Sequence, residues 1–449
     1  MDVQTEQIVS TKHYLRRQTL HTILEEFDGR LMNLSKTDRK NKYRKMRENP
    51  YSFFRGSAYL FFFDVTDLPF SFHTPKEYPT WIMGDMHADN FSGFQSEDDD
   101  IVFDVDDFDE GFLGSYLYDV MRMVVSIRLM TAATDWTEEE QDEFVHYYLK
   151  AYLKQMKKFV SREVDPTSLQ FTADNTKGPI KKTLKKLEDR KQSHELDKQT
   201  TINHESIRSF DIGKSKLSSV SKNEREQITE AWGEYIHSLN PETKQADEFY
   251  RIKDIVKKKG SGIGSTGLKR YYILIEGEQS EHHHDDIILE AKEARTPIPA
   301  YFFPYDEQFW DENKHQGRRV IHTQQAMHHK ADPFLGYFSF RGRDFYVRER
   351  SPFSKELKEK HWTDYKQVKR NVKTMGKISA KIHARADADL EEGVLDYHSE
   401  DAILKAIGKD KRLFYHQLIV WSRHYQHNVE RDYQLFREWL VEEDYFKSY

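Results

Sequence analysis

Two short apolar segments of this chain carry an unusual density of acidic residues. The stretch WIMGDMHADNFSGF (residues 81–94) is followed closely by IVFDVDDFDEGFLGSYLYD (residues 101–119). Burying ionised carboxylates is costly unless a cation or hydrogen bonds compensate their charge. Because these carboxylates are interleaved with residues that favour strands, the fold has to bring a positive partner to them. A divalent metal ion is the simplest such partner.

The composition predicts a folded protein with an aromatic core. The 449 residues include 29 Phe and 25 Tyr and no Cys, which excludes disulfides, thiolate catalysis and cysteine-ligated zinc. At roughly 150 residues per domain the chain is long enough for two or three cores. The net charge of −7 gives no overall basic field, so we expect no nucleic-acid partner. The apolar runs are far shorter than the roughly 20 residues of a membrane span, so we expect a cytoplasmic protein.

Patterning divides the chain into three parts of an α+β fold. Residues 1–245 combine basic N-terminal helices, the acidic loops and amphipathic helices of an α-rich part. Within them, residues 162–225 are polar and Lys-rich, which indicates a solvated helix or linker, or alternatively a nucleic-acid patch. Residues 246–353 predict a small antiparallel sheet, and residues 354–449 predict long helices that complete the α-rich part.

A glycine turn lies between two of the predicted strands. It contains a GxGxxG followed by LKRYYILIEG, which favours another strand rather than the helix that a dinucleotide fold requires. In such a hairpin the missing side chains let backbone N–H groups approach phosphates, as in the nucleotide-covering loop of kinases. The alternative is a tight hairpin without a ligand. The predicted nucleotide-binding residues are Gly262, Ile263, Gly264, Ser265, Thr266 and Gly267.

Lys292, in IILEAKEA, lies on the strand expected after this turn. A nucleotide-covering loop works together with a lysine on a following strand that reaches the phosphates, so we predict a cofactor-binding and catalytic role for Lys292. The alternative is a solvated lysine at a strand edge. Its usual glutamate partner on a helix is not evident, because Glu307 and Glu312 precede the predicted helix and Glu293 points away in an alternating strand.

The acidic loops supply three parts that a phosphotransferase needs. Asn90 follows Asp85 by five residues, and Asp107 follows Asn90 by 17. A phosphotransferase needs a carboxylate to orient or deprotonate the acceptor, and an Asn and an Asp to hold Mg²⁺. In isolation such residues are commonly turn formers or caps. Neighbouring carboxylates that we expect as supporting or alternative ligands are Asp104, Asp106 and Asp109.

Two other kinds of metal site fit the sequence less well. No register of DVDDFDEGF places a Gly sixth and a Glu twelfth, as an EF-hand loop requires. Asp85 and His87 resemble the opening of metallophosphoesterases. Their later Gly-Asn-His segment is represented only by INHES at residues 202–206, without the glycine.

Together these motifs resemble aminoglycoside and choline phosphotransferases, which have a protein-kinase-like fold. MGDMHADN resembles their HGDLHPGN loop, and DDFDEGFLGSYLYD resembles IDFDDAGYGPPLLD, with Asp107, Gly114 and Asp119 in step. The resemblance implies that Asp85 is the catalytic base and that Asn90 and Asp107 are metal ligands. It also implies that Asp119 is a structural residue at the start of a helix.

More closely, the chain resembles the bacterial domain-of-unknown-function family 2252 from about residue 43 to residue 390. The motifs that carry this resemblance are NPYSFFRGSAYLFFFD, GDMHADNF, FDVDDFDE, GIGSTGLKRYYILIEG, LEAKEA and FYVRERSPF.

The order of the motifs implies a circularly permuted, protein-kinase-like two-lobe fold, with a small antiparallel β lobe and a larger α-rich lobe. Ordinary kinases place the glycine loop before the catalytic loop, whereas here the catalytic loop comes first by about 175 residues. Termini of compact domains often lie close together, which makes such a reconnection feasible. FYVRERSPF would be the hinge, and GKISAKIHARAD the helix that leads into the catalytic loop in linear relatives. Where relatives carry a glutamate, RVIHTQQAM has His322.

We therefore expect an ATP- and Mg²⁺-dependent phosphotransferase that acts on a small-molecule hydroxyl or amino acceptor. In this hypothesis Asp85 orients the acceptor, Asn90 and Asp107 hold the metal, and Lys292 and the glycine-turn amides hold phosphates. One alternative is a nucleotide-binding pseudokinase with a regulatory role, which His322 favours. Another is a nucleotidyl (AMP) transferase with ATP inverted in the same cleft.

Overall fold

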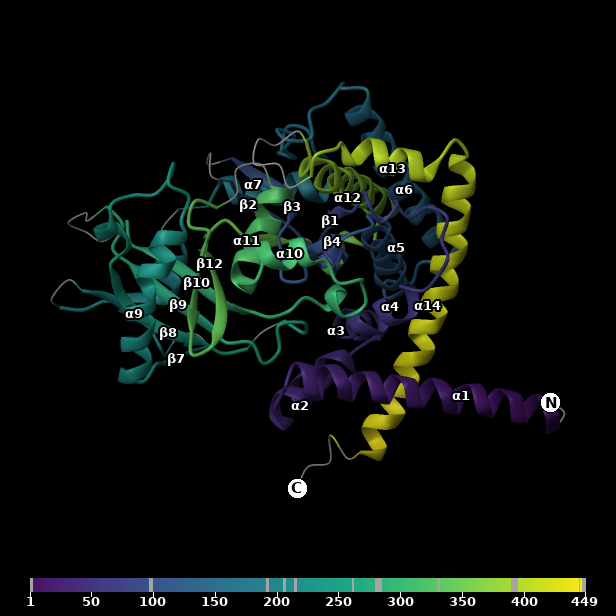
Figure 1. Cartoon of the computed structure of the whole chain (residues 1–449), viewed down its shortest axis with the longest axis horizontal. Coiled ribbons are helices and arrows are strands. Elements are labelled where there is room, and N and C mark those ends of the chain that lie inside the picture. Colours follow the sequence, from purple (N-terminus) through teal and green to yellow (C-terminus); the bar gives the residue numbers. More distant parts are fainter. Residues whose placement is uncertain are drawn as a thin grey trace.

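The chain forms a mixed α+β structure with antiparallel sheets, as the sequence predicts (Figure 1). The computed structural model describes residues 3–96, 100–190, 194–204, 207–213, 216–260, 262–278, 285–328, 332–388, 395–443 and 445. The α-helices are α1 (Val3–Leu24), α2 (Lys36–Met46), α3 (Pro50–Gly56), α4 (Ala58–Val65), α5 (Leu117–Ala132), α6 (Glu138–Val160), α7 (Pro179–Glu188), α8 (His194–Gln199), α9 (Lys222–Ser238), α10 (Glu307–Glu312), α11 (Gln316–Met327), α12 (Tyr365–Arg385), α13 (Ser399–Ile407) and α14 (Lys411–Glu442). The strands are β1 (Thr80–Ile82), β2 (Phe91–Gln95), β3 (Ile101–Val105), β4 (Phe112–Gly114), β5 (Thr200–Ile202), β6 (Arg208–Phe210), β7 (Leu217–Ser219), β8 (Ile252–Lys258), β9 (Arg270–Ile275), β10 (Ile287–Ala294), β11 (Gly336–Phe340), β12 (Arg343–Glu349) and β13 (Lys355–Glu356).

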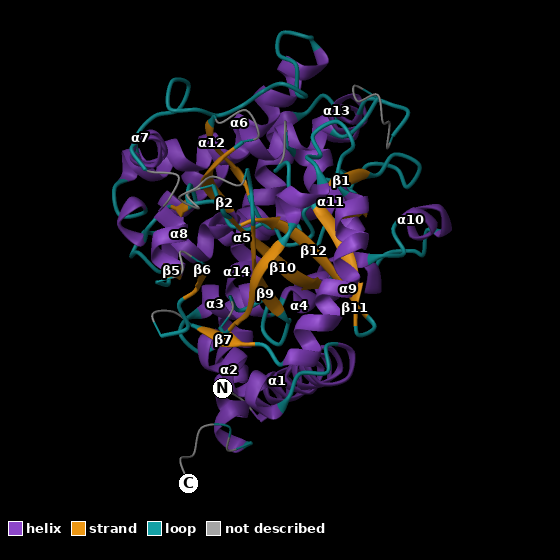
Figure 2. Cartoon of the chain, turned by 90° about the vertical axis from the view of Figure 1, so that its left-hand side faces the viewer, coloured by secondary structure: helices purple, strands orange, loops and turns teal. Residues whose placement is uncertain are grey.

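A six-stranded antiparallel sheet lies towards one end of the molecule (Figure 1, Figure 2). Its strand order is β11-β12-β10-β9-β8-β7, and the glycine turn connects β8 to β9. The register places Lys292 of β10 between Arg270 of β9 and Tyr346 of β12. Helices α9 and α11 pack against this sheet, and Trp232 and Tyr235 of α9 join an aromatic core on one of its faces.

Part of the Lys-rich segment covers the other face of this sheet. Leu196 and Phe210 pack with Tyr272 and Leu274 in a separate apolar cluster, and β7 extends the sheet at its edge. This ordered packing differs from the solvated helix or linker that we expect over residues 162–225. The elements concerned, α8, β5, β6 and β7, are three to six residues long, too short to produce a recognisable apolar period.

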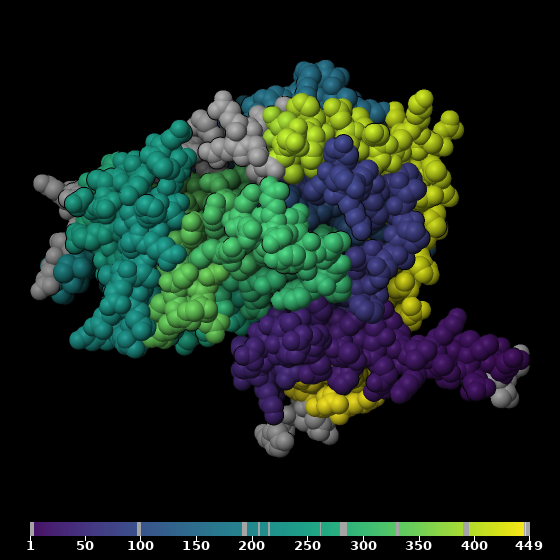
Figure 3. Space-filling model, viewed as in Figure 1, coloured from purple at the N-terminus to yellow at the C-terminus, as the bar shows by residue number. Residues whose placement is uncertain are grey.

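Most of the remaining helices enclose one large core around α5. This helix is buried at nearly every position, and α6 and α14 pack against it. A helix that is largely apolar around its whole circumference belongs inside a protein, which explains the central place of α5, and its buried Asp119 and Arg122 have polar partners there. Helix α1 crosses α14 and projects from the body of the molecule (Figure 3). Among the described residues, no helix combines the length and apolar composition that crossing a lipid bilayer requires.

Two small sheets carry the acidic segments. Strand β1 pairs with β4, and β2 lies between β13 and β3. Trp81, Ile82 and the segment IVFDV thus form the predicted strands beside loops. The loops that leave these strands meet the six-stranded sheet, where Lys292 contacts Asp109.

A buried ion pair ties the N-terminal helices together. Lys42 Nζ lies 2.6 Å from Asp28 Oδ1, and Tyr59 Oη donates to Asp28 Oδ2 over 3.1 Å. All three side chains are buried. Removal of one partner of a buried ion pair leaves an uncompensated charge, which makes such a pair sensitive to single substitutions.

We expect Asp28→Ala to lower the free energy of unfolding by about 3–5 kcal/mol, because Lys42 is left charged and buried. Chemical denaturation followed by circular dichroism measures this change. Glu26→Ala is the matched control, because its partner Arg30 is 69% exposed and exposed ion pairs contribute little. Equal losses in the two variants would contradict the role of the buried pair.

Candidate active site

The first acidic loop is held by the N-terminal end of α5. The Asp119 carboxylate accepts hydrogen bonds from the backbone N–H groups of Met83 (2.7 Å) and Gly84 (3.1 Å), and lies 3.3 Å from His383 Nε2. Gly84 has a φ of +73°, and a Cβ at this position would lie 2.1 Å from the carbonyl oxygen of Glu110. Only glycine fits there. Asp119 therefore fixes the backbone immediately before Asp85.

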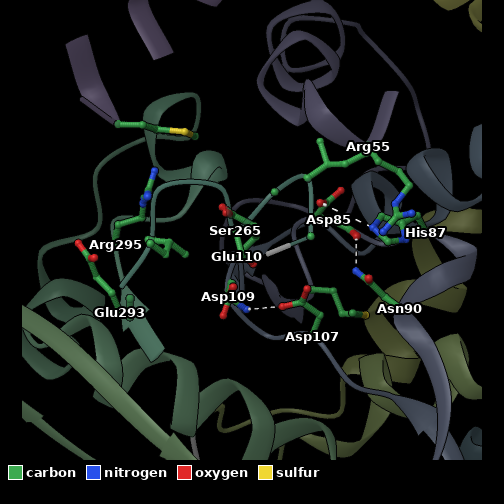
Figure 4. A pocket seen from close by; sticks show the side chains of 17 residues that line it. Arg55, Asp85, His87, Asn90, Asp107, Asp109, Glu110, Ser265, Glu293 and Arg295 are labelled. Carbon is green, nitrogen blue, oxygen red and sulfur yellow. Dashed lines mark hydrogen bonds and ion pairs between the residues drawn. The ribbon is translucent and has the colours of Figure 1, made fainter. Parts of the chain in front are cut away.

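Asp85 lines a small cavity, seen from close by in Figure 4. The buried Arg122 donates from Nε to Asp85 Oδ1, and its guanidinium lies 4.2 Å from the centre of the Phe54 ring. Burial raises the pKa of Asp85 to about 6, although the nearby Arg122 opposes this shift. Asp85 thus combines a fixed position with a proton affinity close to neutral pH.

Asn90 and His87 lie beside Asp85 in the same cavity. Asn90 Nδ2 donates to the carbonyl oxygen of Asp85 over 2.9 Å, so the loop closes on itself (Figure 4). Burial lowers the pKa of His87 well below its usual value, and the cations Arg55 and Arg122 lower it further. His87 is therefore neutral at pH 7.

The second acidic loop reaches the six-stranded sheet through Asp109. Lys292 Nζ donates to Asp109 Oδ2, and Tyr346 Oη donates to Asp109 Oδ1 over 3.0 Å. Burial alone would raise the pKa of Asp109, but Lys292 and then Tyr346 outweigh it and hold this pKa below its usual value. Asp107 Oδ1 lies 3.5 Å from the backbone nitrogen of Asp109 and faces the cavity (Figure 4).

Asp109 supplies the anion that the sequence does not provide for Lys292 on a helix. His322, on α11, is hydrogen-bonded to Asn313 over 3.1 Å. Arg319, on the same helix α11, instead donates to the backbone carbonyl of Asp109 over 2.7 Å. Arg319 of α11 therefore holds the backbone of the acidic loop at Asp109, and the side-chain carboxylate of Asp109 binds Lys292.

The glycine turn closes the cavity from the opposite side. Thr266 is buried and donates to the carbonyl oxygen of Ile263 over 2.9 Å. Gly267 has a φ of +84° and packs against Leu34. The turn residues that line the cavity are Gly262, Ile263, Gly264 and Ser265.

The structure thus brings most of the predicted site residues to one cavity of about 80 Å³. The predicted loop residues that line it are Asp85, Asn90, Asp107 and Asp109. Lys292 does not line the cavity, but it contacts the lining residue Asp109. Thr266 and Gly267 do not line the cavity either.

Two carboxylates that we expected beside the metal do not line this cavity. Asp104 instead pairs with the buried Lys381. Asp106 accepts a hydrogen bond from Ser92 Oγ over 2.5 Å. Burial raises the pKa of Asp106 to about 7 and that of the cavity residue Glu110 also to about 7. Both carboxyl groups therefore bind a proton more readily than an exposed carboxyl group does.

Sequence reasoning missed the cations and the tyrosine that fix these loops. The side chains that contact the acidic loops come from two helices and a strand: Arg122 from α5, Arg319 from α11 and Tyr346 from β12. The signal for Arg122 was present, because an arginine inside the apolar run YLYDVMRMVVSIRLM is buried and requires a partner. The partner itself lies 37 residues away and does not follow from the helix pattern.

The fold and the cavity define a mixed α+β protein in which acidic loops and a glycine turn meet at one site. A family model described as an uncharacterized protein conserved in bacteria (DUF2252) matches residues 36–439. This match spans most of the chain, so the chain belongs to this bacterial family. Comparisons with curated proteins and with solved structures find no match.

We expect a double-mutant cycle to detect strong coupling between Lys292 and Asp109. Lys292→Met and Asp109→Asn should each lower the free energy of unfolding, and the coupling should reach about 1–3 kcal/mol because each charge compensates the other. The exposed pair of Lys314 and Asp311 is the control, for which we expect coupling within experimental error. Additive effects of the Lys292 and Asp109 substitutions would show that the buried pair is not coupled.

Proposed function

We propose that this protein is an ATP- and Mg²⁺-dependent phosphotransferase that acts on a small-molecule hydroxyl or amino acceptor. The observation that carries this proposal is the shared cavity, in which residues near 85, near 107 and in the glycine turn face one another. Positioning and charge stabilisation account for most of phosphoryl-transfer catalysis, and these residue types serve both purposes.

A Mg²⁺ ion fits the donor set of the acidic loops. Carboxylate and amide oxygens are the ligands that Mg²⁺ prefers, and Asp107 and Asn90 offer both on one side of the cavity. Burial is the main cause of the raised pKa values of Asp85 and Glu110, and a bound cation would lower both. When bound, the metal would neutralise phosphate charge. Asp109, held in place by Lys292, would position the neighbouring ligand Asp107.

The roles of the protein groups follow from their positions. Asp85, with a pKa near 6, suits the acceptance of a proton from an acceptor hydroxyl or amine. Arg122 holds Asp85 in place, and Asp119 holds the backbone before it. The backbone N–H groups of the glycine turn are free of bulky side chains at Gly262 and Gly264, which suits contact with phosphate oxygens.

The order of elements supports a circularly permuted, kinase-like arrangement of a β lobe and an α-rich lobe. A glycine turn separates the first two of three antiparallel strands, and Lys292 lies on the third, as its counterpart does in kinases. The segment FYVRERSPF leads from β12 towards the acidic part of the molecule. Helix α12 contacts β1, and its His383 lies beside Asp119. This contact fits the helix that leads into the catalytic loop in linear relatives.

Entry of a whole nucleotide requires the glycine turn to lift. Ligand cavities commonly measure roughly 300–1,000 Å³, whereas this cavity measures about 80 Å³, which suits a metal ion and part of a phosphate. Glycines with positive φ flank the turn at Gly260 (+78°) and Gly267 (+84°), and glycine imposes the smallest conformational restriction on such a movement.

A nucleotide-binding pseudokinase is the second candidate. Two points favour it. Asp109 is already engaged by Lys292 and Tyr346. In addition, His322 stands where the resemblance to kinase-like phosphotransferases implies a glutamate. Nucleotidyl transfer in the same cleft uses the same residues and differs in the product.

We expect Asp107→Ala to weaken Mg²⁺-dependent binding of a non-hydrolysable ATP analogue at least tenfold, because a metal ligand is lost. Isothermal titration calorimetry with and without MgCl₂ measures this affinity, and the melting temperature without ligand should stay close to that of the wild type. Asp311→Ala, on the exposed α10, is the control. An unchanged affinity in Asp107→Ala would remove Asp107 from the metal site.

We expect Asp85→Asn to reduce ATP turnover on a panel of small alcohols and amines by about 10²–10⁴-fold while nucleotide binding persists, because only the proton acceptor is lost. Nucleotide consumption and the mass of the product are the measurements. Nucleotide binding without turnover in the wild type would support the pseudokinase. A product heavier by AMP would support nucleotidyl transfer.

A further inference from the structure

A second, strongly cationic cavity of about 350 Å³ lies between α7 and the segment that follows β13. It shares no lining residue with the candidate active site. Its lining residues are Pro179, Lys182, Thr183, Lys186, Lys355, Glu356, Lys358, Lys360, His361 and Gln367. Five lysines thus face a single glutamate in a protein whose net charge is −7.

The positive charge of this cavity is not neutralised by the protein. In the described part of the chain, none of its five lysines has an ion-pair partner. Lys355 is half-buried, and its pKa is lowered by burial and by nearby cations that include Lys186 and Lys358. The pKa of His361 is lowered in the same way, by burial and then by Lys360 and Lys186. Like charges held this close together destabilise the free protein unless an anion joins them.

Further lysines lie on helices α12 and α6, close to α7. Helices α7 and α12 are in contact and lie close together in Figure 2. On α12, the pKa of Lys377 is lowered by burial and then by Lys154 and Lys158 of α6.

We propose that this cavity binds an anion that carries two or more phosphate groups, held mainly by Lys182, Lys186, Lys355 and Lys358. Lysine is a common point-charge ligand for phosphate, and several lysines around one hollow match several phosphates better than one small anion. The volume is at the lower end for small-molecule sites. Among the described lining residues there is no Phe, Tyr or Trp, and His361 is the one ring, so the cavity offers little surface on which a base would stack. Recognition therefore rests on the phosphates.

The test is calorimetric titration of the full chain with inorganic tripolyphosphate, without divalent cations and at low salt. We expect a dissociation constant in the micromolar range, at least tenfold weaker in Lys186→Gln/Lys358→Gln and weakened by added NaCl. Both lysines are exposed, so the fold should persist, which circular dichroism checks. Lys222→Gln/Lys314→Gln is the matched control, because these lysines lie on other surfaces and pair with Glu226 and Asp311. Its affinity should equal that of the wild type.

Three results would overturn this proposal. The first is no binding up to millimolar tripolyphosphate, and the second is an equal loss of affinity in the control variant. The third is loss of binding in Asp107→Ala but not in Lys186→Gln/Lys358→Gln, which would place the anion in the candidate active site. A short single-stranded RNA serves as a further arm. If it bound more tightly than tripolyphosphate through the same lysines, the partner would be a nucleic acid instead of a small anion.

Discussion

The ion pair between Lys292 and Asp109 determines how the two parts of this protein meet. Its partners are 183 residues apart, one in the middle of the six-stranded sheet and the other in an acidic loop of the helical part. Neither charge is stable alone in this buried place, so the loop and the sheet are held in one relative position. Tyr346 and Arg319 reinforce the contact from β12 and α11. The glycine turn, which leads into the same sheet, is thereby carried to the edge of the acidic cavity.

The carboxylates that line the cavity outnumber the cations that line it, with Asp85, Asp107, Asp109, Glu110 and Glu293 against Arg55 and Arg295. Arg122 is committed to Asp85 and Lys292 to Asp109, while Asp107 has no ion-pair partner in the described chain. Burial keeps the pKa values of Asp85 and Glu110 raised, which is a cost to the free protein. Sites that stabilise charge in a ligand commonly carry such a cost, because their groups are fixed in advance of binding. The proposed metal ion would relieve it.

The parts of this site that sequence predicted are those set by local patterns. Strands β1 and β3, the acidic loops and the hairpin with its glycine turn each have a signature within about ten residues. The partner of Lys292 could not be predicted from the sequence, because its contact with Asp109 depends on how two distant segments pack. Helix α9 was not singled out, since its few buried residues, such as Trp232, become apolar neighbours only when the sheet is present. Residues 194–219 were misjudged because their elements are too short to show a period.

The N-terminal helices constrain the glycine turn. Ile263, at the tip of the glycine turn, is buried against α2 and α3, and a Cβ on Gly56 would lie 2.7 Å from it. A Cβ on Gly267, at the end of the turn, would lie 2.4 Å from Leu34. The turn is thus clamped between the cavity and helices that precede the first acidic loop in the chain. Any opening that admits a nucleotide has to separate Ile263 from this apolar contact, so access to the site and packing of the N-terminal helices are linked.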